Sequence, residues 1–403
     1  MRPTLVHPTP PPNQSPCIAI VYHFFAHYRE AVVGRLARST KAKFTFFSDD
    51  HDYESSIKAG SLLPPVDHRS CPTHRICRSW MWQPKLIRVA ASREFDQLIL
   101  LGNPYWIATW IGAIVGRLTG KRVIFWSHGF LIPPTGAKGF VRRVFLRLAH
   151  LHLFYGRGAK QHAVRIGWNP QRIHVIGNSL DLDRQSAARE AVDERAIASC
   201  RSALFERPNA PTVICSCRLQ PKKRLDLLIR AAATLARRGE PINLVIIGDG
   251  PERAQLEQLA RHESVPTHFE GACYDESRIA LLTMASDLTV CPGFIGLTAI
   301  HSMAYGVPVI TNRRSSEEAP EVESIVPGRT GDLFEDGDLE DLVRVMRLWL
   351  HRSADRQAIR TACIDMVERH WSPDSQLRTI ERAVSGLPPI DGDYPSTMGS
   401  MDP

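Results

Sequence analysis

The sequence predicts an α/β protein with two Rossmann-like domains, each built on a doubly wound parallel sheet, that face a central cleft. Three observations predict this class. Apolar, strand-like runs alternate with helix-like segments over the first half of the chain, and the alternation restarts after a polar stretch at residues 182–208. Strands that alternate with helices form parallel βαβ units. The chain of 403 residues is also long enough for two domains of roughly 150–200 residues each.

Each expected strand is a short apolar run, and each expected helix has apolar residues at helical spacing. In the first half, the expected strands are 18–22, 43–47, 97–101, 123–126, 152–155 and 174–176, and the expected helices are 28–39 and 106–118. In the second half, the expected strands are 212–216, 243–247, 268–270, 288–291 and 307–311, and the expected helices are 225–238, 252–262, 277–284 and 299–305. Ligands of such sheets bind beyond the carboxyl ends of the strands.

Changes in composition suggest the domain boundaries. The proline-rich residues 1–15 and the tail 386–403, rich in Pro, Gly, Ser and Asp, are expected to be disordered. Residues 16–181 are expected to form the N-terminal, acceptor-binding domain, and residues 182–208 the interdomain linker. Residues 209–385 are expected to form the C-terminal, donor-binding domain, whose last helix can cross back to the first domain.

The composition is that of an ordinary globular protein, with 43% apolar and 23% charged residues. No run of about 18 uncharged apolar residues is present, and the N-terminus lacks the apolar core of a signal peptide. We therefore expect a cytoplasmic protein without a membrane-spanning helix. The nine cysteines show no zinc-ligand spacing. Cys71 and Cys77, near His68 and His74, leave a metal site open as an alternative.

The charge is divided unevenly along the chain. Residues 1–180 carry 24 Lys and Arg against 8 Asp and Glu, whereas the remainder carries 26 against 34. A basic N-terminal half suits an anionic membrane surface or a phosphate-bearing acceptor. Residues 137–150 are basic and amphipathic, and form either a helix that lies on such a surface or an ordinary helix packed on the sheet. Nucleic acid is not expected as a partner, because no aromatic-basic recognition pattern is present.

Residues 292–310 are the most informative stretch. Gly293 and Gly296 lie in a loop before a short helical segment, and Gly306 ends that segment before the next strand. Such a loop brings bare backbone N–H groups and a helix N-terminus together, which suits a diphosphate. His301 lies one turn into the helix and is expected to face the ligand.

Three more segments follow expected strands. Residues 218–224, Arg-Leu-Gln-Pro-Lys-Lys-Arg, place cations where they can neutralise a diphosphate, with a solvated basic loop as the alternative. Residues 247–252 are expected to form a structural turn from strand to helix, because they lack the dinucleotide-binding fingerprint. His128 follows the strand at 123–126, and is either a structural histidine or one that points into the cleft.

Together these segments resemble, in the right order, the motifs of the retaining GT-B glycosyltransferases of family 4 across residues 16–385. Residues 217–224 are similar to the family's donor-phosphate motif G-R-L-x-x-x-K-G, with Cys217 and Arg224 in place of its glycines. The other matching segments are residues 178–181, 247–251, 296–310 and 328–334. Each motif alone is a weak signal, but five in order are specific.

The resemblance implies roles for particular residues. It implies that the donor diphosphate and sugar are bound by Arg218, Lys223 and the segment Gly296, Leu297 and Thr298. His128 matches a cleft histidine near the reacting sugar carbon. No cofactor and no catalytic metal is expected, because cations and loop amides stabilise the leaving nucleotide diphosphate in this family.

The resemblance also implies that the basic N-terminal half meets the acceptor, a glycan or a lipid-linked molecule. His27, Tyr28 and Arg29, just after the first expected strand, are the acceptor-side candidates.

The chain departs from the family at the paired glutamates, which fall on Gly293 and His301. In the family, the first glutamate contacts the donor sugar and the second holds the nucleotide ribose. His301 can still form a hydrogen bond with a ribose hydroxyl. Gly293 has no side chain, so either the backbone amides of residues 294–297 or Glu321 from the following loop is expected to replace the first glutamate.

We therefore expect a retaining glycosyltransferase, peripheral on the inner face of the plasma membrane, that moves a hexosyl group from a UDP- or GDP-sugar. Its acceptor is expected to be lipid-linked or a saccharide in bacterial-type envelope or exopolysaccharide biosynthesis. A non-catalytic scaffold subunit is one alternative, because both glutamates are absent. A nucleotide-sugar 2-epimerase, which needs no acceptor, is the other.

Overall fold

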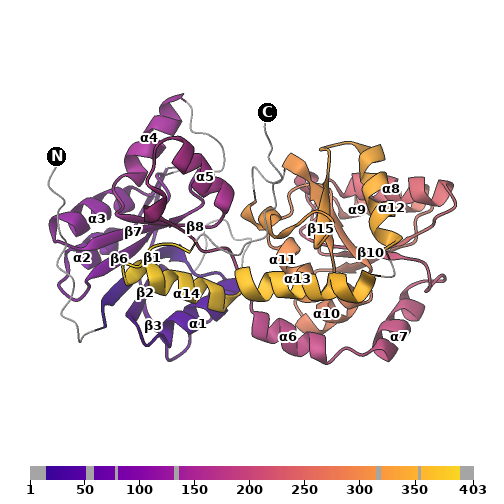
Figure 1. The fold of residues 1–403 in the computed structure, drawn as a ribbon, viewed down its shortest axis with the longest axis horizontal. Helices are drawn as coiled ribbons and strands as arrows, with labels where there is room; N and C mark the ends of the chain where they lie inside the picture. The colour runs from indigo at the N-terminus through magenta and orange to yellow at the C-terminus, as the bar shows by residue number, and fades with distance from the viewer. Residues whose placement is uncertain are drawn as a thin grey trace. The chain divides into compact units, whose positions relative to one another are not determined.

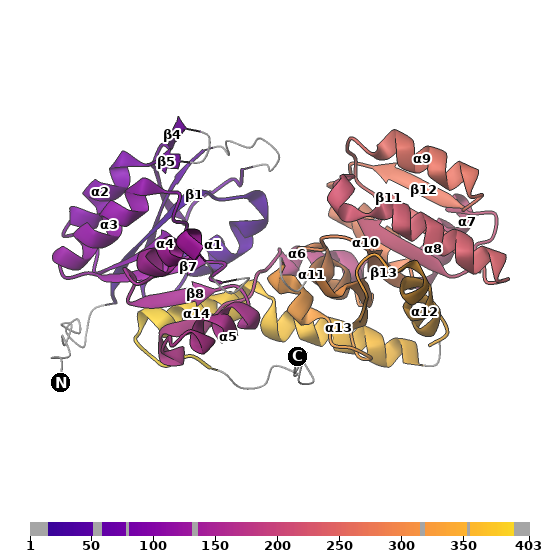
Figure 2. The same ribbon diagram turned by 90° about the horizontal axis from the view of Figure 1, so that it is seen from above.

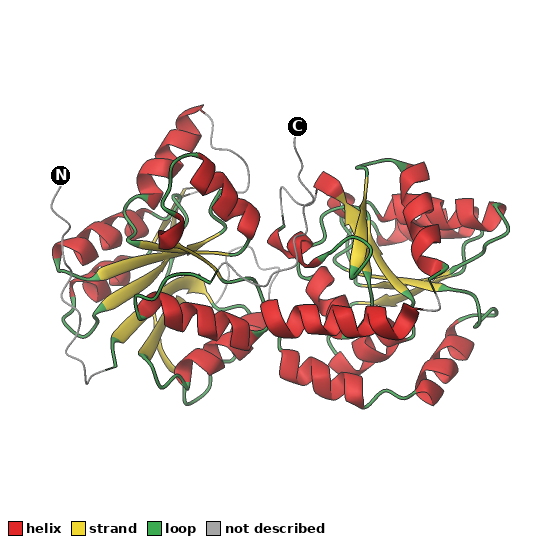
Figure 3. Cartoon of the chain, viewed as in Figure 1, coloured by secondary structure: helices red, strands yellow, loops and turns green. Residues whose placement is uncertain are grey.

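The computed structural model describes residues 15–50, 59–77, 80–130, 136–314, 319–352 and 355–390. Its backbone divides into two compact units, Met1–Asp181 with Pro373–Gly392 and Leu182–Ser372 with Asp393–Pro403. Each unit contains one parallel sheet, of seven strands in the first and six in the second, with helices around it (Figures 1 and 3). The predicted α/β class with two parallel sheets is confirmed. Of the termini predicted to be disordered, residues 1–14 and 391–403 lie outside the described residues, whereas residue 15 and residues 386–390 are described.

The first sheet has the strand order β3-β2-β1-β6-β7-β8-β9, and every neighbouring pair is parallel. Its strands are β1 (Cys17–Phe24), β2 (Lys43–Asp49), β3 (Asp67–Ser70), β6 (Gln97–Leu101), β7 (Arg122–Ser127), β8 (Leu151–Phe154) and β9 (Ile173–Val175). A separate antiparallel pair consists of β4 (His74–Cys77) and β5 (Trp80–Trp82). The sequence analysis missed β3, β4 and β5, because each has only three or four residues and none is fully buried, so that no strand pattern stands out.

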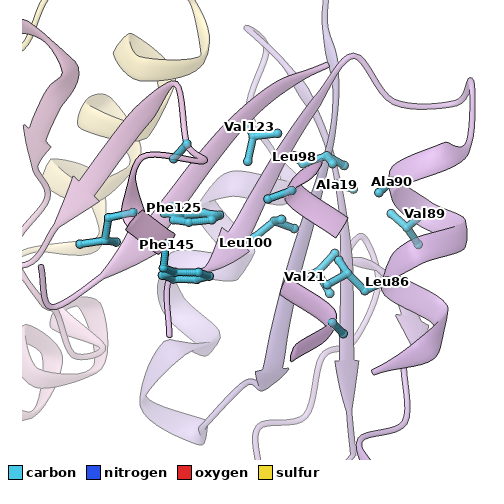
Figure 4. Close-up of a cluster of buried hydrophobic side chains, with 14 of the residues drawn as sticks. Ala19, Val21, Leu86, Val89, Ala90, Leu98, Leu100, Val123, Phe125 and Phe145 are labelled. Atoms are coloured by element: carbon cyan, nitrogen blue, oxygen red, sulfur yellow. The ribbon is translucent and has the colours of Figure 1, made fainter. Parts of the chain in front are cut away.

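Both faces of the first sheet are covered, which explains why its strands are apolar throughout. Successive side chains of β1 point to opposite faces, so that Ile18 and Ile20 join one core and Ala19 and Val21 the other. Figure 4 shows the second core, in which Leu86 packs beside Val21. The helices on this face are α2 (Pro84–Ala91), α3 (Ile107–Leu118), α4 (Gly136–Leu146) and α5 (Arg157–Arg165).

The opposite face is covered by α1 (Glu30–Ala37) and by α14 (Pro373–Val384), which comes from the far end of the chain (Figure 1). Ile380, Ala383 and Val384 are buried in the same core as Ile18. Gln97 of β6 donates its side-chain N–H to the Val384 carbonyl at 2.8 Å. The final helix is therefore a structural part of the first unit.

The second sheet has the strand order β12-β11-β10-β13-β14-β15, again parallel throughout. Its strands are β10 (Thr212–Ser216), β11 (Asn243–Ile247), β12 (Thr267–Gly271), β13 (Leu288–Cys291), β14 (Val309–Asn312) and β15 (Gly331–Phe334). Its α-helices are α6 (Leu182–Glu190), α7 (Glu194–Leu204), α8 (Leu225–Arg237), α9 (Arg253–His262), α10 (Glu276–Met284), α11 (Thr298–Ala304), α12 (Leu339–Leu350) and α13 (Arg356–His370).

Helices cover both faces of this sheet as well. On one face α8 packs on β11 and β13, beside α9 and α12 (Figure 2). On the other, α7 and α10 share a core with Ile214 of β10 and Val245 of β11. Residues 182–204, within the stretch that the sequence suggests as a linker, form α6 and α7, and both helices pack on α10 of the second unit.

Candidate functional site

Three loops meet at the carboxyl ends of β10, β11 and β13 in the second unit. They comprise residues 217–224, 248–251 and 292–297. The N–H groups of Cys217 and Leu219 in the first loop donate to carbonyls at residues 247 and 249, at 2.9 and 3.0 Å. The amides of Gly293 and Phe294 donate to the carbonyls of residues 223 and 222, both at 3.0 Å. Backbone hydrogen bonds therefore hold the three loops together.

This close approach requires glycine at several positions of the three loops, of which Gly248 and Gly293 are the tightest. A Cβ atom on Gly248 would lie 1.8 Å from the carbonyl oxygen of Cys217, so the predicted structural turn serves to admit the neighbouring backbone. A Cβ atom on Gly293 would lie 2.0 Å from the carbonyl oxygen of Lys222. Any side chain at 293, glutamate included, is therefore incompatible with this loop arrangement. The same arrangement uses the Phe294 amide, so of the amides expected to replace the missing glutamate only those of residues 295–297 remain candidates.

The two predicted phosphate-binding cations have different surroundings. Lys223 is buried, and its Nζ donates to the Phe294 carbonyl at 2.6 Å and lies 5.1 Å from the centre of the Phe294 ring. An ammonium group has three N–H donors, so this contact leaves others for a ligand. Arg218 lies in the same loop and is exposed. One cation thus ties two loops together, and the other faces solvent.

The start of α11 is fixed to the end of β10. Gly296 adopts a left-handed conformation with φ of +56°, which glycine accepts without strain, and Leu297 precedes the first helical residue. The hydroxyl of Thr298 donates to the Ser216 carbonyl at 2.8 Å. Glu321 lies in a 3-10 helix, Pro320–Ser324, and is buried.

His301, one turn into α11, is paired with a carboxylate that the sequence analysis did not single out. Its Nε2 lies 2.8 Å from Oε1 of Glu276, the first residue of α10. Tyr305, four residues after His301, donates its hydroxyl to the same oxygen. Burial alone would raise the pKa of Glu276, but the interactions with His301, and then with Tyr305 and Arg184, lower it below its usual value.

The first unit places aromatic and basic side chains together at the carboxyl edge of its sheet. His128 follows β7, and its ring lies 4.7 Å from that of Tyr155, which follows β8. Arg29 is buried and donates from Nη2 to the hydroxyls of Tyr155 and Tyr22, the second at 3.2 Å. Its guanidinium also lies over the rings of Tyr22, at 4.6 Å, and Trp126, at 5.2 Å. Among the described residues, the hydrogen-bond partners of this buried cation are the phenols of Tyr22 and Tyr155.

The cation of Arg29 affects His128. Desolvation by the surrounding protein, followed by the charges of Arg29 and Arg142, lowers the pKa of His128 below its usual value. The His128 side chain is also exposed at the surface, where solvent offsets part of this desolvation. At neutral pH the imidazole of His128 is uncharged, and can donate one hydrogen bond and accept another.

The structure separates the three acceptor-side candidates. Arg29 points into the aromatic cluster, whereas His27 is exposed and Tyr28 is half-buried. Sequence reasoning missed Tyr155, although its position at the end of an expected strand next to that of His128 was a usable signal. Sequence reasoning could not find Glu276, because it lies 25 positions from His301 and its own surroundings indicate only an acidic residue at the start of a helix.

Among the described residues, no helix combines the length and apolar character needed to cross a membrane. Within the same ranges, no three His, Cys, Asp or Glu side chains gather in a way that could hold a metal ion.

Comparison with known proteins decides the family. Residues 199–365 match the family model described as "Glycosyl transferases group 1". The chain is also 31% identical over 290 residues to a protein of Mycolicibacterium smegmatis, "GDP-mannose-dependent alpha-(1-6)-phosphatidylinositol monomannoside mannosyltransferase". That match covers 67% of this chain and 70% of the relative. The chain belongs to the group 1 glycosyl transferases. It is therefore a glycosyltransferase, and the resemblance to family 4 is confirmed.

Solved structures confirm the GT-B fold of this glycosyltransferase. Alr3699/HepE of Anabaena, crystallised with UDP, aligns with a TM-score of 0.67 at 17% identity, over 92% of this chain and all of the other. The apo form of the lipopolysaccharide outer core galactosyltransferase WaaB aligns with a TM-score of 0.67 at 17% identity, over 91% of this chain and 99% of the other. At this identity the likeness establishes the fold.

Proposed function

We propose that this glycosyltransferase moves a hexosyl group from a UDP- or GDP-sugar to a lipid-linked or saccharide acceptor in envelope or exopolysaccharide biosynthesis, with retention of configuration. The observation that carries the proposal is the meeting of the loops 217–224 and 292–297 at the carboxyl edge of the second sheet, with Arg218 and Lys223 on the first of them. The Mycolicibacterium smegmatis relative is named for a GDP-mannose donor and a phosphatidylinositol mannoside acceptor, and the Anabaena protein was crystallised with UDP.

In this proposal the second unit binds the donor. Arg218 offers a planar fork of donors to the diphosphate, and Lys223 adds a second positive charge beside it. The amides of Gly296 and Leu297 contact phosphate or sugar, and His301 forms a hydrogen bond with the ribose. As negative charge develops on the leaving nucleotide diphosphate, these fixed donors stabilise it without a metal ion.

The first unit acts on the transferred sugar and the acceptor. His128, uncharged at neutral pH, contacts a hydroxyl of the transferred sugar near the reacting carbon. Arg29, whose guanidinium is bonded to Tyr155, keeps positive charge beside this histidine and so opposes its protonation. The exposed His27 and the half-buried Tyr28 are the acceptor-side candidates at this edge.

A thermal-shift panel of UDP, GDP and their common sugars tests the donor site, because a ligand that binds only the folded protein raises its melting temperature. We expect one nucleotide series to raise it, and Arg218→Ala to reduce that rise. A panel in which no compound shifts the melting temperature contradicts the proposal. Donor turnover without any acceptor favours the 2-epimerase, and binding without turnover, even with the native acceptor, favours the scaffold subunit.

We further propose that α4 holds the first unit on an anionic lipid surface. Phe140, Val141 and Val144 of α4 are 59%, 43% and 38% exposed, so they do not pack on the sheet. The neighbouring α3, which meets α4 where Trp110 packs on Phe145, exposes another apolar stripe. That stripe consists of Ile111, Ile114 and Leu118. Exposed apolar residues beside basic ones are the pattern of an interfacial helix.

Cosedimentation with vesicles tests this docking. We expect binding to vesicles of phosphatidylglycerol and phosphatidylcholine, and loss of binding when Arg142, Arg143 and Arg147 are replaced by Gln. The matched control replaces three exposed arginines of the second unit, Arg237, Arg238 and Arg344, by Gln. If the α4 variant still binds, or the control is released equally, the proposal is wrong.

A further inference from the structure

The carboxylate of Glu276 joins two helices of the second unit. Glu276 begins α10, and its Oε1 accepts hydrogen bonds from His301 of α11, at 2.8 Å, and from Tyr305, the residue that follows α11. The two donors are separated by four positions, so they lie on one side of α11, and their ring centres are 5.5 Å apart. The side chains of Glu276 and His301 are 18% and 21% exposed. One carboxylate oxygen therefore holds a half-buried imidazole from a neighbouring element.

Two other Glu–His pairs of this unit have a different construction. Glu270 lies 2.6 Å from His268, but Arg278 takes both of its oxygens at 2.7 and 2.8 Å. Glu240 lies 3.1 Å from His351, which is 64% exposed, and also accepts from Arg347. In both pairs an arginine also donates hydrogen bonds to the carboxylate. In the Glu276 pair, the hydrogen bonds to the carboxylate come from the imidazole and a phenol.

The pair fixes which nitrogen of His301 carries a proton. The lowered pKa of Glu276 keeps its carboxylate ionised at neutral pH, and an ionised carboxylate only accepts hydrogen bonds. Nε2 of His301 is therefore the donor to Glu276. In the neutral ring this leaves Nδ1 as the acceptor, and a sugar hydroxyl is a matching donor.

We infer that Glu276 is a positioning residue of the donor site, which holds His301 so that its second nitrogen accepts a hydrogen bond from a ribose hydroxyl of the nucleotide. The inference rests on the proposed function, in which His301 contacts that ribose. Position 301 carries a histidine where the family has a glutamate. In this inference the carboxylate of Glu276 supports that position through its hydrogen bond with His301. A side chain that must bind a ligand in a defined geometry needs a second hydrogen bond that fixes its rotamer, because otherwise it explores several rotamers.

Ribonucleotides and their deoxy forms test the inference. The dissociation constants of UDP and GDP, and of their 2′-deoxy and 3′-deoxy forms, are measured calorimetrically on the full chain. We expect the wild type to bind the ribonucleotide more tightly than one deoxy form. Glu276→Gln should reduce that preference by about tenfold, the effect of losing one hydrogen bond to the ligand. His301→Ala should reduce it equally, and the double variant should fall no further, because Glu276 acts through His301.

Glu270→Gln is the matched control, since it disrupts a Glu–His pair of the same unit outside the loops of the site. We expect it to lower the melting temperature without changing the preference for ribose. If Glu276→Gln does not fold, Tyr305→Phe replaces it, because it removes a hydrogen bond to the same carboxylate oxygen and should weaken the preference to a smaller extent.

The outcomes separate this inference from the proposed function. If neither UDP nor GDP binds the wild type, the proposed donor site itself is wrong. If one of them binds but the wild type does not distinguish ribose from deoxyribose, the donor site stands and the role of Glu276 is overturned. A preference that persists in Glu276→Gln, or in Tyr305→Phe where that variant replaces it, overturns the role as well.

Discussion

His128 of the first unit and His301 of the second are both candidate site residues, and they have opposite electrostatic surroundings. His128 of the first unit packs on Tyr155, close to the buried cation of Arg29. His301 of the second unit forms a hydrogen bond with the carboxylate of Glu276. The first environment opposes protonation of the ring, whereas the second fixes its Nε2 as a donor.

The neighbours of a histidine, rather than its residue type alone, therefore determine what it can bind. An uncharged imidazole beside a cation can bind a sugar hydroxyl without attracting a phosphate. An imidazole bonded to a carboxylate is held in one orientation and presents one defined nitrogen to a ligand. The proposed roles in sugar transfer and nucleotide binding follow this division.

The largest expected effect comes from His128. If it contacts the transferred sugar, His128→Ala should reduce the transfer rate by about a hundredfold or more, within the range usual for a positioned acid, base or hydrogen-bonding group. The dissociation constant of the donor should stay nearly unchanged. Transfer assays with radiolabelled donor and calorimetric titration measure the two quantities. His262→Ala, at an exposed position at the end of α9, is the control, and equal rates for both variants would remove His128 from the mechanism.

Lys223 is expected to have the next largest effect. Lys223→Ala should weaken binding of the nucleotide diphosphate by about 1.5–3 kcal/mol, the cost of losing a charge-assisted hydrogen bond. It should also lower the melting temperature, because Nζ no longer holds the Phe294 carbonyl. Lys222→Ala, at the exposed neighbouring position, should have little effect on either quantity. An unchanged dissociation constant in Lys223→Ala refutes the assignment of this cation to the donor site.

Acidification should destabilise the first unit, because the folded structure holds two of its histidines, His152 and His23, in the neutral form. Burial, followed by the charge of Arg172, lowers the pKa of His152 to about 3, and burial with Arg29 does the same for His23. The unfolded chain, with a histidine pKa near 6.5, then binds more protons than the folded chain, so the unfolding free energy falls as the pH drops below that value. Each histidine should cost about 1–2 kcal/mol between pH 7.5 and pH 5.

Urea unfolding followed by tryptophan fluorescence measures this loss, since six of the eight tryptophans belong to the first unit. His152→Phe should reduce the pH dependence, because it removes one titrating group from an aromatic environment. In the second unit, the hydrogen bonds from Arg278 help to lower the pKa of Glu270 to about 2. The interaction between Glu270 and Arg278 should therefore persist over the same pH range. If the unfolding free energy of the first unit stays constant down to pH 5, the prediction is wrong.

The smallest expected effect concerns Arg224, which replaces a glycine of the family motif. Arg224 adopts the left-handed conformation with φ of +51°, and a non-glycine residue there costs about 1 kcal/mol. Arg224→Gly should therefore leave the unfolding free energy unchanged or raise it by up to about 1 kcal/mol. Arg230→Gly, inside α8, should lower it by about 1 kcal/mol. Equal destabilisation by the two substitutions would show that the backbone of Arg224 is not strained.

The sequence was sufficient to predict the two parallel sheets, because buried parallel strands are apolar throughout and alternate with amphipathic helices. It also located the loops 217–224 and 292–297, since glycine and cations after a strand are a local pattern. It could not explain Gly293, because the steric reason for glycine there is the backbone carbonyl of Lys222, 71 positions earlier in the chain. Nor could it find the Glu276–His301 pair, whose members are 25 positions apart and meet only in the folded second unit.

The position of α14 in the chain has a consequence for protein synthesis. The core around Ile18 is complete only when Ile380 and Val384 cover it, so the first unit to be translated cannot finish folding until the last helix has left the ribosome. The second unit, which lies between these two segments, has all its strands available earlier. A premature stop codon before residue 373 would therefore leave the N-terminal sheet with an uncovered apolar face, exposed to chaperones and proteases, rather than release a shortened but intact enzyme.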